Sequence, residues 1–302
     1  MEKESKIKKA KVLGIDIGFG HTKVYSDGVK YKIPTQIAYV SEDANMEVEK
    51  VNIAGREYVL GRDTKYSSFR IEIATVEELI RYAPAFLKHI LDKFGGFDII
   101  VSGLPPNCKF YALKFQESLK SVAMSSEVIV LPQGLGILYD VVSTEKISGD
   151  TMVIDAGYNT VDCLVAERVD NTWKKKIAIT LEGYGVIKAV EFMRAILPER
   201  FAIVKNWSAA RLLEVFEKGY MHFETEKIDL KNYKTEAILN YSEILFSKIK
   251  QELKDFYKDV EFIILAGGGA YYLESKVLGS KVYIPNEPEF SQARGYYVAG
   301  QR

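Results

Sequence analysis

The chain has few of the residues that build disulfide frameworks or metal clusters. It contains only two cysteines in 302 residues, Cys108 and Cys163, and they lie in unrelated sequence contexts. This excludes a disulfide scaffold and a zinc-finger spacing, and it fits a reducing cytoplasm. The three histidines, His21, His89 and His222, are isolated from one another. No metal cluster and no serine or cysteine catalytic triad can be built around them.

Net charge and long apolar segments are also missing. Lys plus Arg and Asp plus Glu number 41 each, so no overall positive field would hold DNA or a membrane surface. No apolar run reaches the ~18 residues needed to span a bilayer, and the lysine-rich residues 1–10 lack the apolar segment of a signal peptide. We therefore expect a cytoplasmic protein without membrane attachment or direct nucleic-acid binding, long enough for two domains.

Glycine-rich segments are present, but none has the spacing of a P-loop or of a dinucleotide-binding motif. Instead, one short pattern occurs twice: Asp-Ile-Gly-Phe-Gly-His-Thr-Lys at 16–23 and Asp-Ala-Gly-Tyr-Asn-Thr-Val-Asp at 155–162. Each copy follows an apolar run and precedes a second strand-like segment, which predicts a β-hairpin with a glycine-containing tip. Two similar hairpins predict two similar half-molecules.

The segments around the first turn alternate between strand and helix patterns, which indicates an α/β sheet. We expect an insertion at about 35–70, and Pro84 either kinks the long helix that follows or starts a new one. In chain order the predicted elements are a meander over 12–33, strands at 51–53 and 58–60, a helix over 75–94, a buried strand over 97–101 that opens into a loop at Ser102, a strand over 128–131 and a helix over 134–142.

The second half repeats this plan with a helical insertion at about 183–258. Its predicted elements are strands over 151–155, 161–167 and 173–180, with a turn at 170–171, helices over 185–196, 208–218 and 235–256, and a buried strand over 262–265 that ends in three glycines. We predict domain I at 1–147 and domain II at 148–290, with the terminal helix 291–302 packing back on domain I.

Five segments in order resemble the signature of the actin, Hsp70 and sugar-kinase superfamily. They are residues 14–18 with Lys23, 132–136, 155–157, 266–270 and 289–295. The form of the first turn, the Pro-Gln-Gly connector and the terminal Ala-Arg-Gly-Tyr resemble the ParM/StbA-type actin-like proteins, including their archaeal relatives, over essentially the whole chain. The resemblance implies an α/β protein of two RNase H-like, actin-type domains with a nucleotide cleft between them.

The chemistry of the two turns fits a nucleotide with Mg²⁺. Asp16 and Asp155 would repel phosphates unless a divalent cation lay between them, bound directly or through water. Glycines let backbone amides approach phosphate, and Lys23 can add a positive charge at the β- or γ-phosphate, although each hairpin alone could be a plain turn. The predicted nucleotide contacts in the turns are Gly18, Phe19, Gly20, His21, Thr22, Lys23, Gly157, Tyr158, Asn159 and Thr160.

Hydrolysis also needs an oriented water, because catalysis of phosphoryl transfer is mostly positioning and electrostatic stabilisation. The resemblance places a water-orienting residue at Gln133, which together with Asp16 and Asp155 forms the predicted catalytic set. A glutamine is a weak base, so we expect slow turnover. The alternative for Gln133 is a helix-capping role, and Asp162 either orients water or stabilises the second turn.

The base and sugar are expected at Gly267, Gly268 and Gly269, where a flat ring can lie on the backbone. The alternative is a tight turn between a strand and a helix. In the second insertion, where relatives bind adenine and ribose with charged residues, we include Gly183, Arg211 and Glu214. The alternative for Arg211 and Glu214 is that they are solvated helix charges.

The resemblance implies a Mg²⁺-dependent ATPase that polymerises head to tail into filaments. Such filaments segregate plasmid or other DNA through a DNA-bound adaptor protein, and connectors near Gln133 and Ala293 act as hinges. The partners expected are other copies of the chain and the adaptor. Two alternatives stay open: a sugar-type small-molecule kinase, for which no base aspartate is seen in the first domain, and a nucleotide-binding scaffold with negligible turnover. The sequence does not choose between ATP and GTP.

Overall fold

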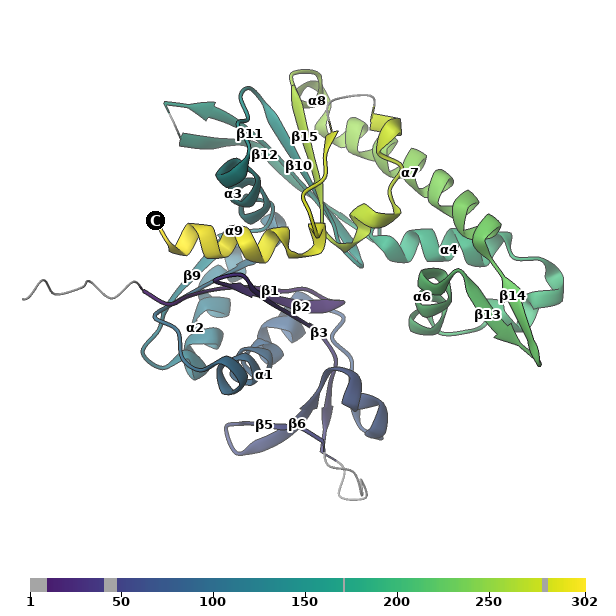
Figure 1. Ribbon diagram of the computed structural model, residues 1–302, viewed down its shortest axis with the longest axis horizontal. Coiled ribbons are helices and arrows are strands. Elements are labelled where there is room, and N and C mark those ends of the chain that lie inside the picture. Colours follow the sequence, from purple (N-terminus) through teal and green to yellow (C-terminus); the bar gives the residue numbers. More distant parts are fainter. Residues whose placement is uncertain (1–9, 41–47, 171, 279–281) are drawn as a thin grey trace, which may run out of the picture. The chain divides into compact units, whose positions relative to one another are not determined.

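The computed structural model describes residues 10–40, 48–170, 172–278 and 282–302 (Figure 1). The chain divides into two compact units. Unit 1 runs to Thr144 and includes Phe290–Arg302, and unit 2 is Glu145–Glu289. The lysine-rich start of the chain, residues 41–47 of the predicted insertion and Asn171 of a predicted turn lie outside the described residues.

Unit 1 is built on a five-stranded mixed sheet with the order β3-β2-β1-β8-β9. The first three strands form the predicted antiparallel meander, and the last two run parallel to β1. The hairpin predicted at the first turn is therefore confirmed. The strands are β1 (Val12–Ile17), β2 (His21–Ser26), β3 (Val29–Pro34), β8 (Ile99–Leu104) and β9 (Glu127–Pro132).

Strand β8 is longer at its carboxyl end than the sequence predicts. The predicted loop at Ser102 is wrong, because β8 stays paired with β9 up to Leu104 opposite Pro132. Gly103 lies within this extension, and a Cβ atom there would collide with the Tyr296 hydroxyl. The glycine lets strand and helix pack closely where a loop was expected.

One face of this sheet packs on helices α1 (Val76–Phe94) and α2 (Ala112–Ala123), the second of which was not predicted. Helix α1 begins at Thr75, which forms a capping box with Glu78, as the cap chemistry of these residues favours. Pro84 lies inside one continuous helix, so the predicted restart is wrong. A proline removes the bond to the carbonyl four residues earlier, and the Ser118 hydroxyl donates to that carbonyl, Ile80 O, at 2.6 Å.

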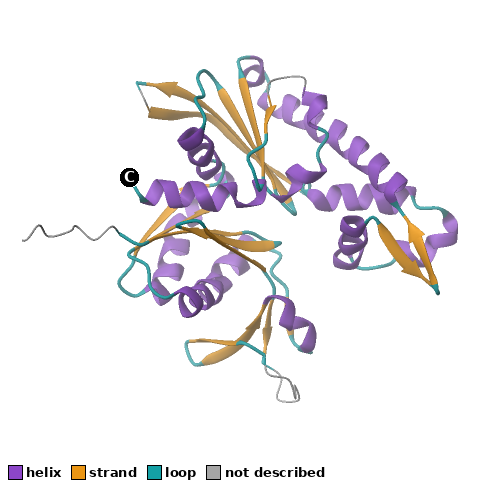
Figure 2. Cartoon of the chain, in the orientation of Figure 1, coloured by secondary structure: helices purple, strands orange, loops and turns teal. Residues whose placement is uncertain are grey.

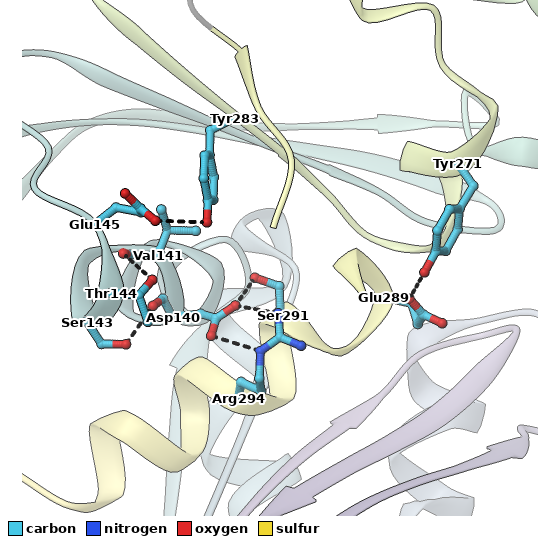
Figure 3. A network of polar contacts seen from close by, with 10 residues as sticks. All are labelled: Asp140, Val141, Ser143, Thr144, Glu145, Tyr271, Tyr283, Glu289, Ser291 and Arg294. Atoms are coloured by element: carbon cyan, nitrogen blue, oxygen red, sulfur yellow. Dashed lines mark hydrogen bonds and ion pairs between the residues drawn. The ribbon is translucent and has the colours of Figure 1, made fainter. Parts of the chain in front are cut away.

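The other face of the sheet is covered by α9 (Ser291–Gly300), which also packs on α3 (Leu135–Thr144). The two helices are joined by an ion pair shown in Figure 3. The buried Asp140 carboxylate accepts hydrogen bonds from Ser291 Oγ at 2.6 Å and from Arg294 Nε and Nη2 at 2.9 and 2.8 Å. This network lies next to both points at which the chain passes between unit 1 and unit 2.

The insertion of unit 1 is a small four-stranded sheet with the order β5-β6-β4-β7 (Figure 2). Its two longest strands were predicted, whereas β4 and β7 were not. The elements are β4 (Ile37–Tyr39), β5 (Lys50–Ile53), β6 (Arg56–Leu60), β7 (Arg70–Ile71) and the 3₁₀ helix η1 (Gly61–Tyr66). A second 3₁₀ helix, η2 (Pro106–Tyr111), precedes α2.

Unit 2 has a sheet of the same plan, with the order β12-β11-β10-β15-β16. The second predicted hairpin, between β10 and β11, is confirmed, and β15 runs parallel to β10. The strands are β10 (Thr151–Ala156), β11 (Thr160–Val169), β12 (Thr172–Glu182), β15 (Phe262–Ala266) and β16 (Val282–Tyr283).

The insertion of unit 2 is mainly helical, as predicted, but it also contains an unpredicted hairpin, β13 (Tyr220–Phe223) with β14 (Glu226–Asp229). Its helices are α4 (Val186–Ile196), α5 (Ala202–Lys205), α6 (Ala209–Lys218), α7 (Lys231–Leu253) and α8 (Asp255–Lys258), with the 3₁₀ helix η3 (Glu199–Phe201). After β15 come the 3₁₀ helices η4 (Gly268–Tyr272), η5 (Ser275–Leu278) and η6 (Pro288–Phe290). Across the described residues, every helix is too short or too polar to span a bilayer.

Candidate functional site

The first glycine turn joins β1 to β2 in unit 1. Gly18 N–H donates to His21 O at 3.2 Å, and Thr35 N–H donates to Gly20 O at 3.0 Å, so backbone bonds hold the turn at both ends. The predicted contact residues Phe19 and Thr22 point toward protein. Phe19 packs on the core of the unit, and the fully buried Thr22 hydroxyl pairs with Thr35 at 3.1 Å. These two side chains hold the hairpin, and that of Thr22 is closed to a ligand.

Asp16 brings three of the predicted site residues together. It lies directly opposite Lys23 in the hairpin register, and Lys23 Nζ donates to Asp16 Oδ2 at 2.8 Å. Gln133, placed at the end of β9, donates from Nε2 to Asp16 Oδ1 at 3.4 Å. The buried carboxylate therefore has one oxygen engaged by a cation and the other by a carboxamide. Sequence alone predicted these three residues separately, and the structure places them in contact.

Two further cations lie beside this cluster and were not predicted. Lys32 stands opposite Lys23 in the β2–β3 register, which places Asp16, Lys23 and Lys32 in one row across three strands. Side chains paired in this way share one face of a sheet. Arg62 is in η1, directly after Gly61, which packs against the end of β3. The pairing of Lys32 could have been read from the alternation of β2 and β3, whereas the position of Arg62 depends on tertiary packing.

The pKa of His21 reflects the positive charge of this surface. Burial, and after it the positive charges of Lys32, Lys23 and Arg62, together lower its pKa from 6.5 to about 4. At neutral pH His21 is therefore uncharged and is surrounded by three cations. Such a surface favours an anion.

The second turn, in unit 2, repeats the backbone of the first. Gly157 N–H donates to Thr160 O at 2.9 Å, as Gly18 does to His21. Its carbonyls, however, are already used. Those of Gly157, Tyr158 and Asn159 accept from the first amides of α4 and its cap, Val186 N, Ile187 N and Gly185 N, each at 3.1 Å. Helix α4 therefore braces this turn.

The charge at the second turn is opposite to that at the first. Asp162 occupies the register position that Lys23 has in unit 1, directly across from Asp155. Asp162 is buried and accepts hydrogen bonds from Thr180 Oγ1 at 2.5 Å and from Thr160 Oγ1 at 3.5 Å. These contacts are those of a turn-stabilising residue. Two carboxylates paired across strands form a surface that attracts a cation.

The three glycines after β15 have different surroundings. Gly267 has a φ of 82°, and a Cβ atom there would collide with Asp155 Oδ1. A Cβ atom on Gly269 would lie 2.7 Å from that of Ala156, whereas one on Gly268 would meet nothing within 4 Å. Gly267 and Gly269 are therefore required for packing on the second turn, and Gly268 is the position open to a ligand.

The remaining predicted residues have contacts typical of an exposed helix. The Arg211 guanidinium lies 3.5 Å from the centre of the Trp207 ring, and Glu214 pairs with Lys218 at 3.7 Å. Gly183 has a φ of 72° in the turn before α4, with open space around it. The glycine is explained by this left-handed backbone conformation.

Comparisons with known proteins agree with this architecture. The family described as "Actin like proteins N terminal domain" matches residues 14–136, and "Archaeal actin homologue MreB-like, C-terminal" matches residues 153–278. None of the curated proteins matches the chain in sequence.

Several solved structures resemble the whole chain. Ta0583, an archaeal actin homolog, is 18% identical with a TM-score of 0.77, over 97% of this chain and 99% of that one. The protomer of a 15-stranded ParM filament from Clostridium botulinum is 19% identical with a TM-score of 0.76, over 97% and 99%. Ta0583 in complex with ADP gives 18% and 0.74, over 96% and 99%. The predicted fold, α/β with two actin-type domains, is confirmed.

Proposed function

Because this chain belongs to the actin-like protein family, we propose that it is a Mg²⁺-dependent ATPase that polymerises into nucleotide-dependent filaments. The observation that carries the proposal is the cluster at the first turn, where the Asp16 carboxylate binds both Lys23 and Gln133. A cation, a carboxylate and a carboxamide beside a glycine turn are suited to binding phosphate and orienting water. Among the relatives, one archaeal actin homolog was solved with ADP and one ParM as a filament.

In this proposal Lys23 binds the β- or γ-phosphate beside the backbone amides of the first turn. Its bond to Asp16 fixes the ammonium group there before a nucleotide arrives. Gln133 uses Nε2 to reach Asp16, which leaves its carbonyl oxygen to accept a hydrogen bond from water. A neutral amide orients water but removes its proton poorly, so turnover is slow.

The acidic residues fit a hydrated divalent cation. Asp16 and Asp155 are the carboxylates that would hold such a cation; Asp16 Oδ2 already accepts from Lys23, and Asp155 lies opposite Asp162 in the strand register. Mg²⁺ retains several waters and takes phosphate oxygens as ligands. Held by these residues, it would neutralise part of the phosphate charge. Within the described part of the chain no group of three or more His, Cys, Asp or Glu side chains could hold a metal ion.

The base and sugar are assigned to unit 2. Gly268 is open to a ligand while its neighbours pack on the second turn, so we propose that the base lies along this loop. Arg211 and Glu214 share an exposed face of α6, and with Gly183 they stay proposals for contacts with adenine and ribose. Whether the base is adenine or guanine is decided by nucleotide competition.

The structure gives other positions for the proposed hinges than those expected from the sequence. Gln133 and Ala293 both lie inside unit 1, whereas the chain passes between the units after Thr144 and after Glu289. We therefore propose hinges at these two crossings. A change at a hinge on nucleotide binding is a common route from a ligand to an assembly state.

We propose that copies of the chain are its first partners and that an adaptor protein connects the filament to DNA. The equal numbers of acidic and basic residues support an adaptor, because nothing in the overall charge favours direct DNA binding. The role in plasmid or other DNA segregation, like the cytoplasmic location, stays a prediction.

Light scattering and pelleting with ATP, with ADP and without nucleotide test the proposal, together with phosphate release. We expect ATP-dependent pelleting and slow Mg²⁺-dependent phosphate release. ADP production that requires a sugar would instead identify a small-molecule kinase. Nucleotide binding without pelleting or turnover would identify a scaffold.

A further inference from the structure

The surface around the first turn carries more positive charge than one phosphate contact needs. Lys23, Lys32 and Arg62 all act on His21, and Asp16 is the carboxylate that pairs with this group. Neither Lys32 nor Arg62 forms an ion pair with any residue that the structure describes, and both side chains are exposed. Two cations that have no ion pair among the described residues therefore lie beside the turn to which we assign phosphate binding.

Backbone geometry fixes where these two cations stand. Lys32 is in register with Lys23, so its side chain leaves the sheet on the same face as Asp16 and Lys23. Arg62 approaches from the insertion. A Cβ atom on Gly61 would lie 2.6 Å from Ile33 Cγ1, which shows how tightly η1 sits on the end of β3. The same end of β3 lies opposite His21, because His21 pairs with Pro34.

We propose that Lys32 and Arg62 extend the anion site beyond Lys23 and make it selective for the length of the phosphate chain. The inference rests on the proposed function, because it takes the bound phosphate chain to be that of a nucleoside triphosphate. Lys23 binds the phosphates held at the turn, and Lys32 and Arg62 bind the terminal phosphate. A longer chain carries more negative charge, so each added phosphate gains from these cations while a monophosphate does not reach them.

Arg62 gives this arrangement a structural consequence. It belongs to η1, which follows β6 of the insertion, whereas Lys23 and Lys32 belong to the main sheet of unit 1. A triphosphate that contacts all three therefore ties the insertion to the main sheet. We expect backbone amides of β6 and η1 to exchange more slowly with ATP than with ADP, because the bound chain opposes local opening.

Binding measurements with ATP, ADP, AMP and inorganic tripolyphosphate test the proposal on the full chain. We expect Lys32→Gln and Arg62→Gln each to weaken ATP and tripolyphosphate binding about fivefold, to weaken ADP binding less and to leave AMP unchanged. Matched controls are Lys30→Gln on the same strand and Lys65→Gln on the same 3₁₀ helix, both of which should bind ATP as the unmodified chain does. The double variant should also show a smaller loss of ATP affinity on raising the salt concentration.

The outcomes separate this inference from the proposed function. Equal losses for AMP and ATP, or unchanged ATP binding in the double variant, would overturn the inference while leaving a nucleotide-binding protein. A protein that binds tripolyphosphate in a Lys32-dependent way but no nucleotide would refute the ATPase and the nucleoside triphosphate as ligand, while the selectivity for phosphate-chain length would stand. Stronger dependence on Lys32 for single-stranded DNA than for tripolyphosphate would overturn the inference in favour of a nucleic-acid contact.

Discussion

Folding stability should fall when the pH is lowered from 7 to 5, and His21 should account for a measurable part of that loss. Burial and the charges of Lys32, Lys23 and Arg62 lower its pKa from 6.5 to about 4 in the folded chain. The unfolded chain therefore binds more protons between these values, and the stability is present above pH 6.5 and lost as the pH falls toward 4. Because proton binding is linked to folding, these two pKa values give a loss of about 2 kcal/mol in the free energy of unfolding between pH 7 and pH 5.

Urea unfolding of the unmodified chain and of His21→Gln at both pH values measures this contribution. The glutamine cannot titrate, so the variant should lose about 2 kcal/mol less over the interval. His222→Gln, at an exposed position, is the matched control and should behave as the unmodified chain does. If His21→Gln lost as much stability as the control, the charge environment deduced for the first turn would be refuted.

Three other changes test the site and the fold. Asp155→Ala should abolish Mg²⁺-dependent hydrolysis, because it removes the carboxylate offered to the cation beside Asp162; unchanged phosphate release would remove Asp155 from the site. Gln133→Ala should lower kcat about 10²-fold with little change in ATP affinity, since it removes an oriented acceptor and no phosphate contact; a large loss of ATP affinity at unchanged kcat would show that Gln133 serves binding instead. Ser118→Ala should lower the free energy of unfolding by about 1 kcal/mol, because it leaves Ile80 O beside Pro84 without its donor. The control is Ser121→Ala on the same helix, whose hydroxyl bonds only within α2 and whose loss should change urea unfolding little. Equal losses in both variants would contradict this account of Pro84.

The sequence predicted the parts of the fold that repeat or have a clear period. The two hairpins followed from the repeated turn, and long helices such as α1 followed from their apolar spacing. Strands β4, β7 and β16 have three residues or fewer, which is too short for alternation to be recognised. Helix α2 does carry apolar residues at helical spacing, at Phe115, Leu119 and Ala123, so its pattern was available in the sequence.

The candidate site residues divide in the same way. Asp16 and Lys23 could be proposed from the sequence because the turn chemistry is local, and the seven-residue spacing to Lys23 and to Asp162 already contained the contrast between the two turns. Arg62 could not be found in this manner, because its position depends on how η1 packs on β3. Pro84 shows the same limit, since the hydroxyl that compensates for it is in a helix 38 residues away from the carbonyl it serves.

Because α9 follows unit 2 in the chain, one face of the unit 1 sheet can be covered only late in synthesis. The helix covers the face of the unit 1 sheet that includes Gly14, and its Arg294 closes the ion pair with Asp140. On the ribosome, therefore, β1 and β8 emerge long before their cover does, and the whole of unit 2 is made in between. Unit 2 can fold as a continuous stretch of chain, while unit 1 must wait with one sheet face bare. Chaperone contact with the nascent chain should concentrate on that face until the last turn of α9 has left the exit tunnel.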